Sequence, residues 1–244
     1  CRVGWSQLCR QGITVYGVTA HGGHAQFLRV PARTLVPLPE ELSFAEGAAV
    51  ACGTGTAYGA LRRMRLAGGD SLAVFGQGPV GLSATLLGAA LGARVIAVET
   101  SAERARLAQA FGADAVIDAS KEDPVAALKD LTRGEGVALA LDCTGAAAAR
   151  KAAVQCVRTW GTACYVGEGG EVTLEVSPDL LRRQVTLIGS WTFSAMGMLE
   201  CARFVAERNL GLERIFTHRW RLEQADEAYR SFDTQSTGKG VFLL

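Results

Sequence analysis

The sequence lacks an excess of charge of either sign. Lys and Arg number 25 against 24 Asp and Glu, so the formal net charge is only +1. Runs of basic residues are missing as well, which leaves nucleic acid and anionic membrane surfaces without an electrostatic basis for binding. We therefore expect neither of these partners.

Long apolar runs and targeting signals are also missing. The stretch VGLSATLLGAALGA, residues 80–93, is interrupted by glycines and is too short to cross a bilayer. No signal peptide is recognisable, and the first residue is Cys rather than Met. These features predict no membrane span and favour a cytoplasmic location.

A dense, even-numbered set of cysteines, which marks small secreted disulfide scaffolds, is not present. The seven cysteines are scattered over 244 residues, which favours reduced thiols that serve as small buried hydrophobes or as metal ligands. They are Cys1, Cys9, Cys52, Cys143, Cys156, Cys164 and Cys201.

What the sequence does contain is enough apolar residues (49%) for a substantial core, and a regular alternation of strand and helix patterns. Near-continuous apolar strands separated by helices are typical of a parallel sheet covered on both faces. The expected strands are residues 71–76, 93–99, 114–118, 137–142, 161–167 and 185–190.

The two flanks have a different character. Residues 1–52 carry turn signals and one strand-like run, 24–30, whereas residues 191–244 read as two helices and two strands. We expect both flanks to belong to one domain, interrupted by an α/β domain at 53–190. The last helix should have one apolar face, formed by Leu222, Ala225, Ala228, Tyr229 and Phe232.

Three glycines in AVFGQGPVGLS lie between the first strand and its helix. Gly76 suits the tight turn, Gly78 lets a pyrophosphate approach the backbone, and Gly81 allows close packing of helix and strand. The helix N-terminus offers unpaired N–H groups and a favourable dipole. This context predicts a dinucleotide site.

Glu99 ends the second strand, 18 residues after Gly81. An acid there accepts hydrogen bonds from the adenosine ribose and repels a 2′-phosphate, which favours NAD over NADP. Arg104, about one helical turn on, is placed to touch the ribose. The competing interpretation of Glu99 is a solvated acid at a strand end.

Taken together, these motifs resemble the zinc-dependent medium-chain dehydrogenases, which include alcohol, threonine and polyol dehydrogenases. The resemblance runs over essentially the whole chain, and it implies a Rossmann-type doubly wound parallel sheet inserted in a GroES-like, β-rich catalytic domain that is incomplete here. Its motifs are GGHAQFLRVPARTLVPLPEELSFAEGAAVACGTGTAYGAL, GQGPVG, ERARLAQAFGAD, LDCTG, YVGEGG and GKGVFLL.

The resemblance implies hydride transfer between an alcohol or polyol CH–OH group and NAD. Cys52, in ACGTGTAYGAL, matches the third protein ligand of the catalytic zinc, and Thr56 matches a threonine beside the nicotinamide. Zinc would lower the pKa of the substrate hydroxyl, and the alkoxide would pass its hydride to the nicotinamide. A buried structural thiol is the alternative interpretation of Cys52.

Other positions match residues that hold NAD in the family. Val166 matches a hydrophobic wall of the nicotinamide site, and Lys239 matches a basic residue near the pyrophosphate, with a solvated lysine as the alternative. The implied NAD-binding set is Thr56, Gly76, Gly78, Pro79, Val80, Gly81, Glu99, Arg104, Cys143, Thr144, Val166, Gly167 and Lys239.

The opening CRVGWSQLC matches the second half of a four-cysteine structural zinc lobe, C-x2-C-x2-C-x7-C, with Cys1 and Cys9 as its third and fourth ligands. The other catalytic zinc ligands of the family, a Cys and a His followed by Glu, have no counterpart in this sequence. We therefore expect a fragment that keeps a dinucleotide-binding fold but has little or no dehydrogenase activity.

None of the three histidines has a role that the resemblance implies. His21 and His24 are either a metal-binding pair or polar residues of a glycine-rich turn, and the turn is the favoured interpretation. We expect His218, in a strand beside basic residues, to be structural.

Two other functions stay open: a zinc-free NADPH-dependent quinone or enoyl reductase of the same fold, and a catalytically silent NAD-binding protein. Glu99 and Cys52 speak against the first. The substrate itself is undefined, since Trp191, Phe193 and Met196 indicate only an apolar or aromatic wall. The resemblance also implies a homodimer or homotetramer, with strand 185–190 as a free edge.

Overall fold

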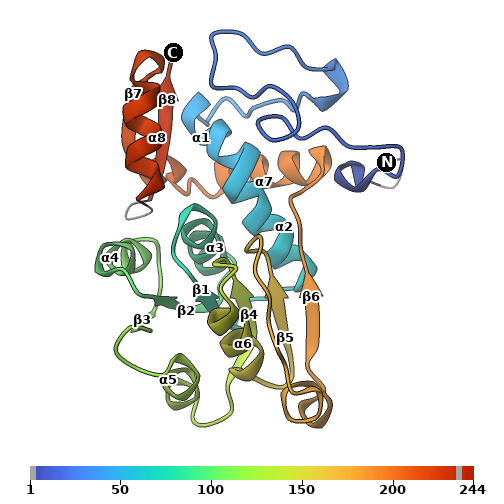
Figure 1. Ribbon diagram of the computed structural model, residues 1–244, viewed down its shortest axis with the longest axis vertical. Helices are drawn as coiled ribbons and strands as arrows, with labels where there is room; N and C mark the ends of the chain where they lie inside the picture. The colour runs from blue at the N-terminus through green and yellow to red at the C-terminus, as the bar shows by residue number, and fades with distance from the viewer. Residues whose placement is uncertain (1–3, 235–237) are drawn as a thin grey trace. The chain divides into compact units, whose positions relative to one another are not determined.

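The structure, a computed structural model, describes residues 4–234 and 238–244 (Figure 1). The chain divides into two compact units. One is the continuous segment 56–191, and the other combines residues 4–55, 192–234 and 239–244.

The 56–191 unit is built on a six-stranded sheet in the order β3-β2-β1-β4-β5-β6, in which every neighbouring pair is parallel. The chain adds strands outward from β1 in one direction and then on the other side, so the order reverses between β1 and β4. This confirms the predicted doubly wound sheet. The strands are β1 Ser71–Phe75, β2 Arg94–Glu99, β3 Ala115–Asp118, β4 Val137–Asp142, β5 Val157–Tyr165 and β6 Thr186–Gly189.

Helices cover both faces of this sheet (Figure 1). On one face, a Cβ added to Gly88 would lie 2.9 Å from Leu72 and 3.1 Å from Val95, so α3 packs tightly on the strands. On the other face, Leu128 joins a buried cluster with Phe75. Because both faces are covered, the strands are apolar at consecutive positions. The helices are α2 Gly55–Arg63, α3 Pro79–Ala90, α4 Ala102–Ala110, α5 Pro124–Leu131 and α6 Ala147–Gln155.

Local signals set the helix starts in this unit. The Asp123 carboxylate accepts the Val125 N–H at 2.9 Å and Pro124 is the first residue of α5, as the sequence predicts. Ser101 caps α4. None of the helices in the described ranges combines the length and apolar character that crossing a bilayer requires.

Two predicted boundaries in this unit are wrong. The Ser177-Pro178 pair predicts a short helix after β5 that Ser177 caps. The structure has instead a π-helical turn, Val176–Leu180, in which the Asp179 carboxylate accepts the Glu175 N–H at 2.8 Å. Strand β5 begins at Val157 rather than at Gly161. It includes Trp160 at φ +63°, next to a register shift against β4 that sequence periodicity does not signal.

The second unit has fewer regular elements. Its parallel pair of strands, β7 and β8, packs against α8, and this agrees with the two strands expected within residues 191–244. A capping box between Ser43 and Glu46 starts α1. The elements are α1 Phe44–Ala49, a π-helical turn η3 Val50–Thr54, α7 Ala195–Glu207, β7 Phe216–Arg221, α8 Ala225–Asp233 and β8 Lys239–Leu243.

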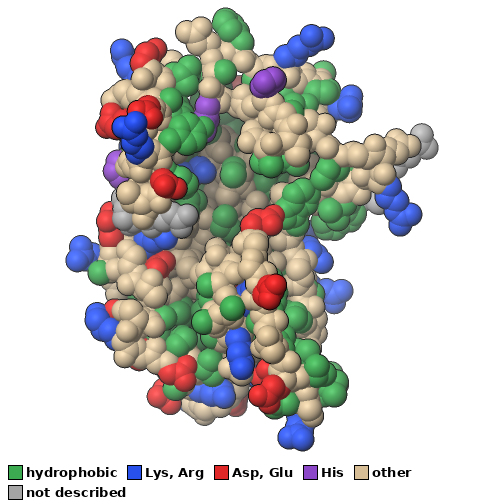
Figure 2. Space-filling view, viewed as in Figure 1, with side chains coloured by type: hydrophobic (Ala, Val, Ile, Leu, Met, Phe, Trp, Pro, Cys, Tyr) green, Lys and Arg blue, Asp and Glu red, His purple; other side chains and the backbone are tan. Residues whose placement is uncertain are grey.

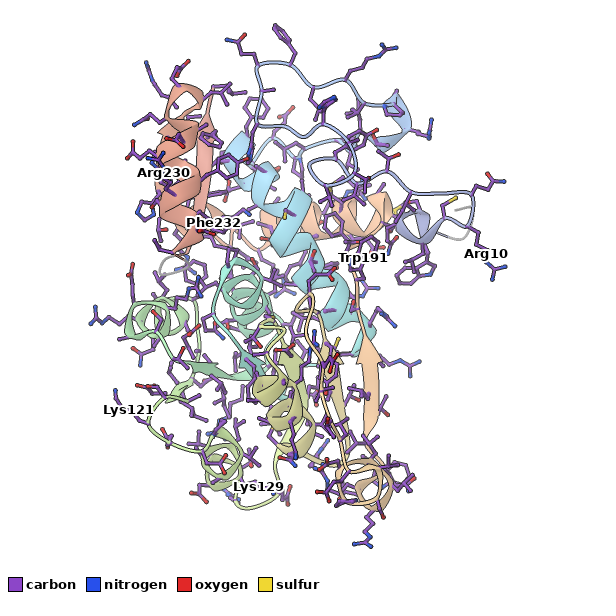
Figure 3. The ribbon with its side chains drawn as sticks, viewed as in Figure 1. Arg10, Lys121, Lys129, Trp191, Arg230 and Phe232 are labelled. Atoms are coloured by element: carbon purple, nitrogen blue, oxygen red, sulfur yellow. The ribbon has the colours of Figure 1, made fainter. Side chains whose placement is uncertain are left out.

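Two expectations for this unit need correction. Residues 24–30 form no strand, and Phe27 is 90% exposed; within the described part of the chain this segment has no ladder partner. In α8 only Ala228 of the predicted apolar face is fully buried, while Tyr229 and Phe232 are about half exposed. Figure 3 shows Phe232 and Arg230 on this helix.

Two leucines of α5 provide a matched test of the core. Leu128 is completely buried and Leu131 is 36% exposed on the same helix. We expect Leu128→Ala to lower the free energy of unfolding by about 2–5 kcal/mol, because it removes buried contacts and leaves a cavity. Leu131→Ala should cost less than about 1 kcal/mol. Urea denaturation followed by circular dichroism measures both, and equal costs would contradict this packing.

Candidate functional site

The turn after β1 brings three predicted glycines together. Gly76 has φ +81°, and its N–H donates to the Val98 carbonyl at 2.8 Å. A Cβ on Gly76 would lie 2.5 Å from the Thr144 methyl carbon. A Cβ on Gly81 would lie 1.8 Å from the Gly76 carbonyl oxygen. Both positions therefore require glycine, because the phosphate loop, residues 76–81, is packed against β1 and against the loop after β4.

Gly78 is different, since a Cβ there would meet no atom within 4 Å and its φ of −71° is ordinary. It is the N-cap residue of α3, with no side chain capping the helix and Pro79 in the first turn. The first turn, which includes Val80 and Gly81, has N–H groups without intrahelical acceptors. The open space beside Gly78 is thus suited to an anionic group at a helix N-terminus.

Glu99 is not a solvated acid, because only 7% of it is exposed. Its Oε1 accepts the N–H groups of Thr100 and Ser101 at 2.6 and 3.0 Å and the Thr100 hydroxyl at 3.2 Å. Its Oε2 accepts the Gln77 N–H at 2.7 Å. A carboxylate oxygen accepts about two hydrogen bonds, so Oε2 keeps capacity for one more donor such as a ribose hydroxyl.

Gln77 is a residue of this site that the sequence analysis missed. It is completely buried; its Nε2 donates to the Val74 carbonyl at 3.0 Å and its Oε1 accepts the Thr85 hydroxyl at 2.9 Å. These bonds hold the second residue of the phosphate loop in place. A polar residue between the glycines is the only signal in the sequence, and it does not reveal burial.

A second carboxylate lies beside Glu99, since Asp118 is its partner in the β2–β3 register. The Lys121 ammonium at 2.7 Å, together with the Ser120 hydroxyl and N–H, lowers the pKa of Asp118 to about 2. Figure 3 shows Lys121 on the loop that follows β3. Asp118 is therefore ionised at neutral pH, and the Lys121 ammonium offsets its charge at this edge of the sheet.

The loop after β4 is organised by Asp142, which is completely buried. Its carboxylate accepts the Thr144 N–H and hydroxyl at 2.9 and 2.6 Å and the Gly145 N–H at 3.2 Å. Its carbonyl accepts the N–H groups of Val166 and Gly167 at 2.9 and 3.1 Å. The predicted residues Thr144, Val166 and Gly167 are thus brought together by an acid that was not predicted.

Cys143, between them, is half-buried, and its N–H donates to the Phe75 carbonyl at 2.9 Å. Desolvation raises the pKa of its thiol well above the usual value, with the Asp142 charge as the next cause. Burial also raises the pKa values of Cys156, Cys164 and Cys201 to about 12. These thiols stay protonated at neutral pH, so a nucleophilic role is not supported.

The predicted metal ligands belong to two sites, Cys52 to the catalytic zinc and Cys1 with Cys9 to the structural lobe. Cys52 is exposed in η3, Cys9 is half-buried, and Cys1 lies outside the described residues. A catalytic zinc takes three protein ligands, yet the described residues contain no group of three His, Cys, Asp or Glu able to hold a metal. The described residues by themselves therefore do not complete a zinc site, and Cys52 stays a predicted ligand.

The histidines take part in ring contacts instead. His24 Nδ1 lies 2.6 Å from the Tyr229 hydroxyl, and its ring meets those of Tyr229 and Phe242 edge-on. The His218 ring stacks on the Trp220 ring, with 5.2 Å between the ring centres. His21 is exposed. The ring contacts agree with structural roles for His24 and His218.

The remaining predicted residues are distributed over both units. In the 56–191 unit, Thr56 and Arg104 are half-buried, and Trp191 donates its indole N–H to Glu168. In the other unit, Lys239 is the half-buried first residue of β8. There, too, Phe193 packs against Gly55 and Met196 is 59% exposed.

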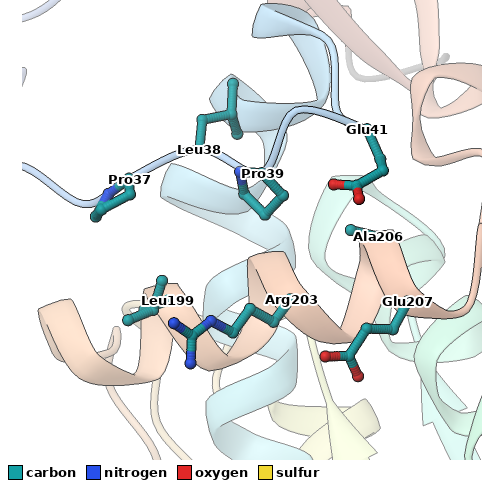
Figure 4. A pocket seen from close by; sticks show the side chains of 8 residues that line it. All are labelled: Pro37, Leu38, Pro39, Glu41, Leu199, Arg203, Ala206 and Glu207. Atoms are coloured by element: carbon teal, nitrogen blue, oxygen red, sulfur yellow. The ribbon is translucent and has the colours of Figure 1, made fainter.

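A cavity of about 340 Å³ lies between the loop 37–41 and α7 (Figure 4). Its charged lining residues Glu41, Arg203 and Glu207 are exposed, so water solvates them and it lacks the desolvated polar groups of a catalytic pocket. None of the predicted site residues lines it. Figure 2 shows charged side chains of both signs interspersed over the visible face.

The chain is similar in sequence to known dehydrogenases. The family model described as zinc-binding dehydrogenase matches residues 79–207. The uncharacterised zinc-type alcohol dehydrogenase-like protein YphC of Escherichia coli is 39% identical over 99% of this chain and 69% of its own length. L-threonine 3-dehydrogenase of Pyrococcus horikoshii is 31% identical over 100% of this chain and 70% of its own.

A solved structure extends the likeness to the fold. Alcohol dehydrogenase TADH from Thermus sp. ATN1 superimposes with a TM-score of 0.91 at 31% identity, covering 100% of this chain and 73% of that one. The chain thus spans roughly 70% of the length of these relatives. On these matches, the chain belongs to the zinc-binding dehydrogenase family.

Proposed function

We propose that the chain binds NAD through its 56–191 unit and belongs to an oxidoreductase that transfers hydride between an alcohol or polyol CH–OH group and NAD. The observation that carries this proposal is the open backbone at Gly78 next to the buried Glu99, whose Oε2 is joined to the same loop through Gln77. Relatives named as alcohol and threonine dehydrogenases support the substrate class.

The phosphate loop and Glu99 have separate tasks in this proposal. The first turn of α3 binds the pyrophosphate through N–H groups and the helix dipole, and Gly78 gives it access. Glu99 accepts a ribose hydroxyl on Oε2, and its negative charge disfavours a 2′-phosphate by repulsion. Bound NAD supplies the hydride acceptor of the reaction.

The nicotinamide half then extends toward the strands on the other side of β1. Since the adenosine ribose lies at β2, the rest of the dinucleotide crosses the reversal point between β1 and β4. Val166 and Gly167, held by the Asp142 carbonyl, bound that part of the site. Zinc enters none of these steps, because the described residues do not form a site for it.

Gly78 and Gly81 give the sharpest test. We expect Gly78→Val to weaken NADH binding by more than about tenfold, since a side chain would obstruct the pyrophosphate, while the melting temperature changes little. Gly81→Ala should lower both the NADH affinity and the melting temperature, because its Cβ would overlap the Gly76 carbonyl. Calorimetric titration and thermal unfolding measure the two effects, and undiminished NADH binding by Gly78→Val would overturn the assignment.

Glu99→Ser tests cofactor choice. Loss of hydrogen bonds to a charged group should weaken NADH binding by about 10- to 100-fold and weaken NADPH binding less. Glu103→Ser, an exposed acid in the first turn of α4, is the matched control and should change neither. An unchanged ratio of the two dissociation constants would reject the role of Glu99. Tighter binding of NADPH than NADH by the unsubstituted chain would favour the zinc-free reductase.

Metal content and activity form a further test. We expect the 244-residue chain to bind NADH yet to contain substoichiometric zinc and to show no zinc-dependent alcohol oxidation, because the described residues lack a three-ligand group. Elemental analysis and NADH formation with an alcohol and polyol panel provide the measurements. Stoichiometric zinc that Cys52→Ser removes would show that this expectation is wrong.

A further inference from the structure

Arg150, on α6, is a charged side chain that the proposed function leaves unused. It is only 8% exposed, although arginine is rarely buried without a specific partner. Its Nε lies 3.5 Å from Asp142 Oδ2 and makes no hydrogen bond of good geometry. Its Nη2 donates to the Gly167 carbonyl at 2.7 Å. The guanidinium therefore joins the loops that follow β4 and β5.

Tyr165 completes this arrangement. The Arg150 guanidinium carbon lies 5.6 Å from the centre of the Tyr165 ring, and the Tyr165 hydroxyl donates to the Arg150 carbonyl at 3.0 Å. Burial raises the pKa of Tyr165 to about 12, so its hydroxyl stays protonated and remains a donor. The side chain and the backbone of Arg150 are thus both tied to the last residue of β5.

The two loops that Arg150 joins, 143–146 and 166–170, touch through their backbones. A Cβ on Gly167 would lie 2.1 Å from the Gly145 nitrogen, and a Cβ on Gly145 would lie 2.4 Å from the Glu168 carbonyl oxygen. Gly170 has φ +67°, and its Cβ would lie 2.4 Å from the Gly145 carbonyl oxygen. Because the two backbones are in such close contact, the position of loop 143–146 depends on the bonds that hold loop 166–170 in place.

Both loops follow the carboxyl ends of β4 and β5, on the side of the reversal point away from Glu99. With the adenosine half bound at β2, the nicotinamide half faces these loops. We propose that Arg150 is a positioning residue for the nicotinamide half: through Asp142, Tyr165 and the Gly167 carbonyl it fixes the backbone that this half contacts. This inference rests on the proposed NAD binding.

Arg150→Lys tests it, because lysine keeps the charge beside Asp142 but cannot also reach the Gly167 carbonyl in the same planar geometry. The probes are NADH, which carries the nicotinamide, and ADP-ribose, which lacks it. We expect NADH affinity to fall about tenfold, as for loss of one buried hydrogen bond, and ADP-ribose affinity to stay within about twofold. The fluorescence gain of bound NADH should fall as well.

Arg183→Lys is the matched control. Arg183 also donates to several carbonyls, those of Val154, Gln155, Val157, Pro178 and Asp179, but next to the start of β5, at the opposite end of the strand. We expect it to lower the melting temperature and to leave both affinities within about twofold of the unsubstituted chain.

The outcomes separate the two proposals. Equal losses of NADH and ADP-ribose affinity in Arg150→Lys, or no loss of either, would overturn the positioning role while NAD binding stands. An unsubstituted chain that binds neither ligand would overturn both. If Arg150→Lys does not fold, Tyr165→Phe takes its place, with about a threefold loss expected for NADH only; a loss shared by ADP-ribose, or no loss, contradicts the inference.

Discussion

The parallel pairing of β1 with both β2 and β4 is the constraint on which the rest of the site depends. Parallel strands end at one edge of a sheet, so the loops after β1, β2 and β4 meet there. The strand order reverses at this point, and the loops diverge enough to leave room for a ligand. The β1–β2 pair brings Glu99 beside the phosphate loop, and the β1–β4 pair brings Thr144 there.

Buried carboxylates hold these loops in place. Glu99 ends β2 and Asp142 ends β4, and each accepts N–H groups from the loop after its own strand. Burying a carboxylate costs free energy unless hydrogen bonds and countercharges offset it. Both acids accept hydrogen bonds from backbone N–H groups and one hydroxyl, and Asp142 also has the Arg150 guanidinium as a countercharge. Their bonds set the backbone on either side of β1.

The contrast with the second unit is physical as well. In the 56–191 unit, both sheet faces are covered, and β1, β2 and β4 are buried at nearly every position. In the second unit, large apolar side chains such as Phe27 and Phe44 are each 90% exposed, and the described strands form a single two-stranded pair. A two-stranded ladder satisfies few backbone groups. Residues 4–43 contain no strand of a sheet, only short 3-10 turns, isolated turns and bends, and unassigned stretches.

The sequence by itself determined the order of strands and helices between residues 71 and 189, the glycine loop and the acid that ends β2. Periodicity, helix caps and glycine spacing are local signals, and they can be recognised without knowledge of the fold. The tertiary structure decided which acids are buried and what they bind. The spacing of Glu99 from Gly81 predicts its role. Its hydrogen bond with Gln77 cannot be predicted in this way, because the two residues are 22 positions apart and meet only when β1 and β2 pair. Asp142, Arg150 and Tyr165 likewise read as an ordinary acid, a helix cation and a strand aromatic; only the packing of α6 on β4 and β5 turns them into one network. The strand-like run at 24–30 shows the converse, since a strand pattern becomes a strand only where a partner strand is present to accept its hydrogen bonds.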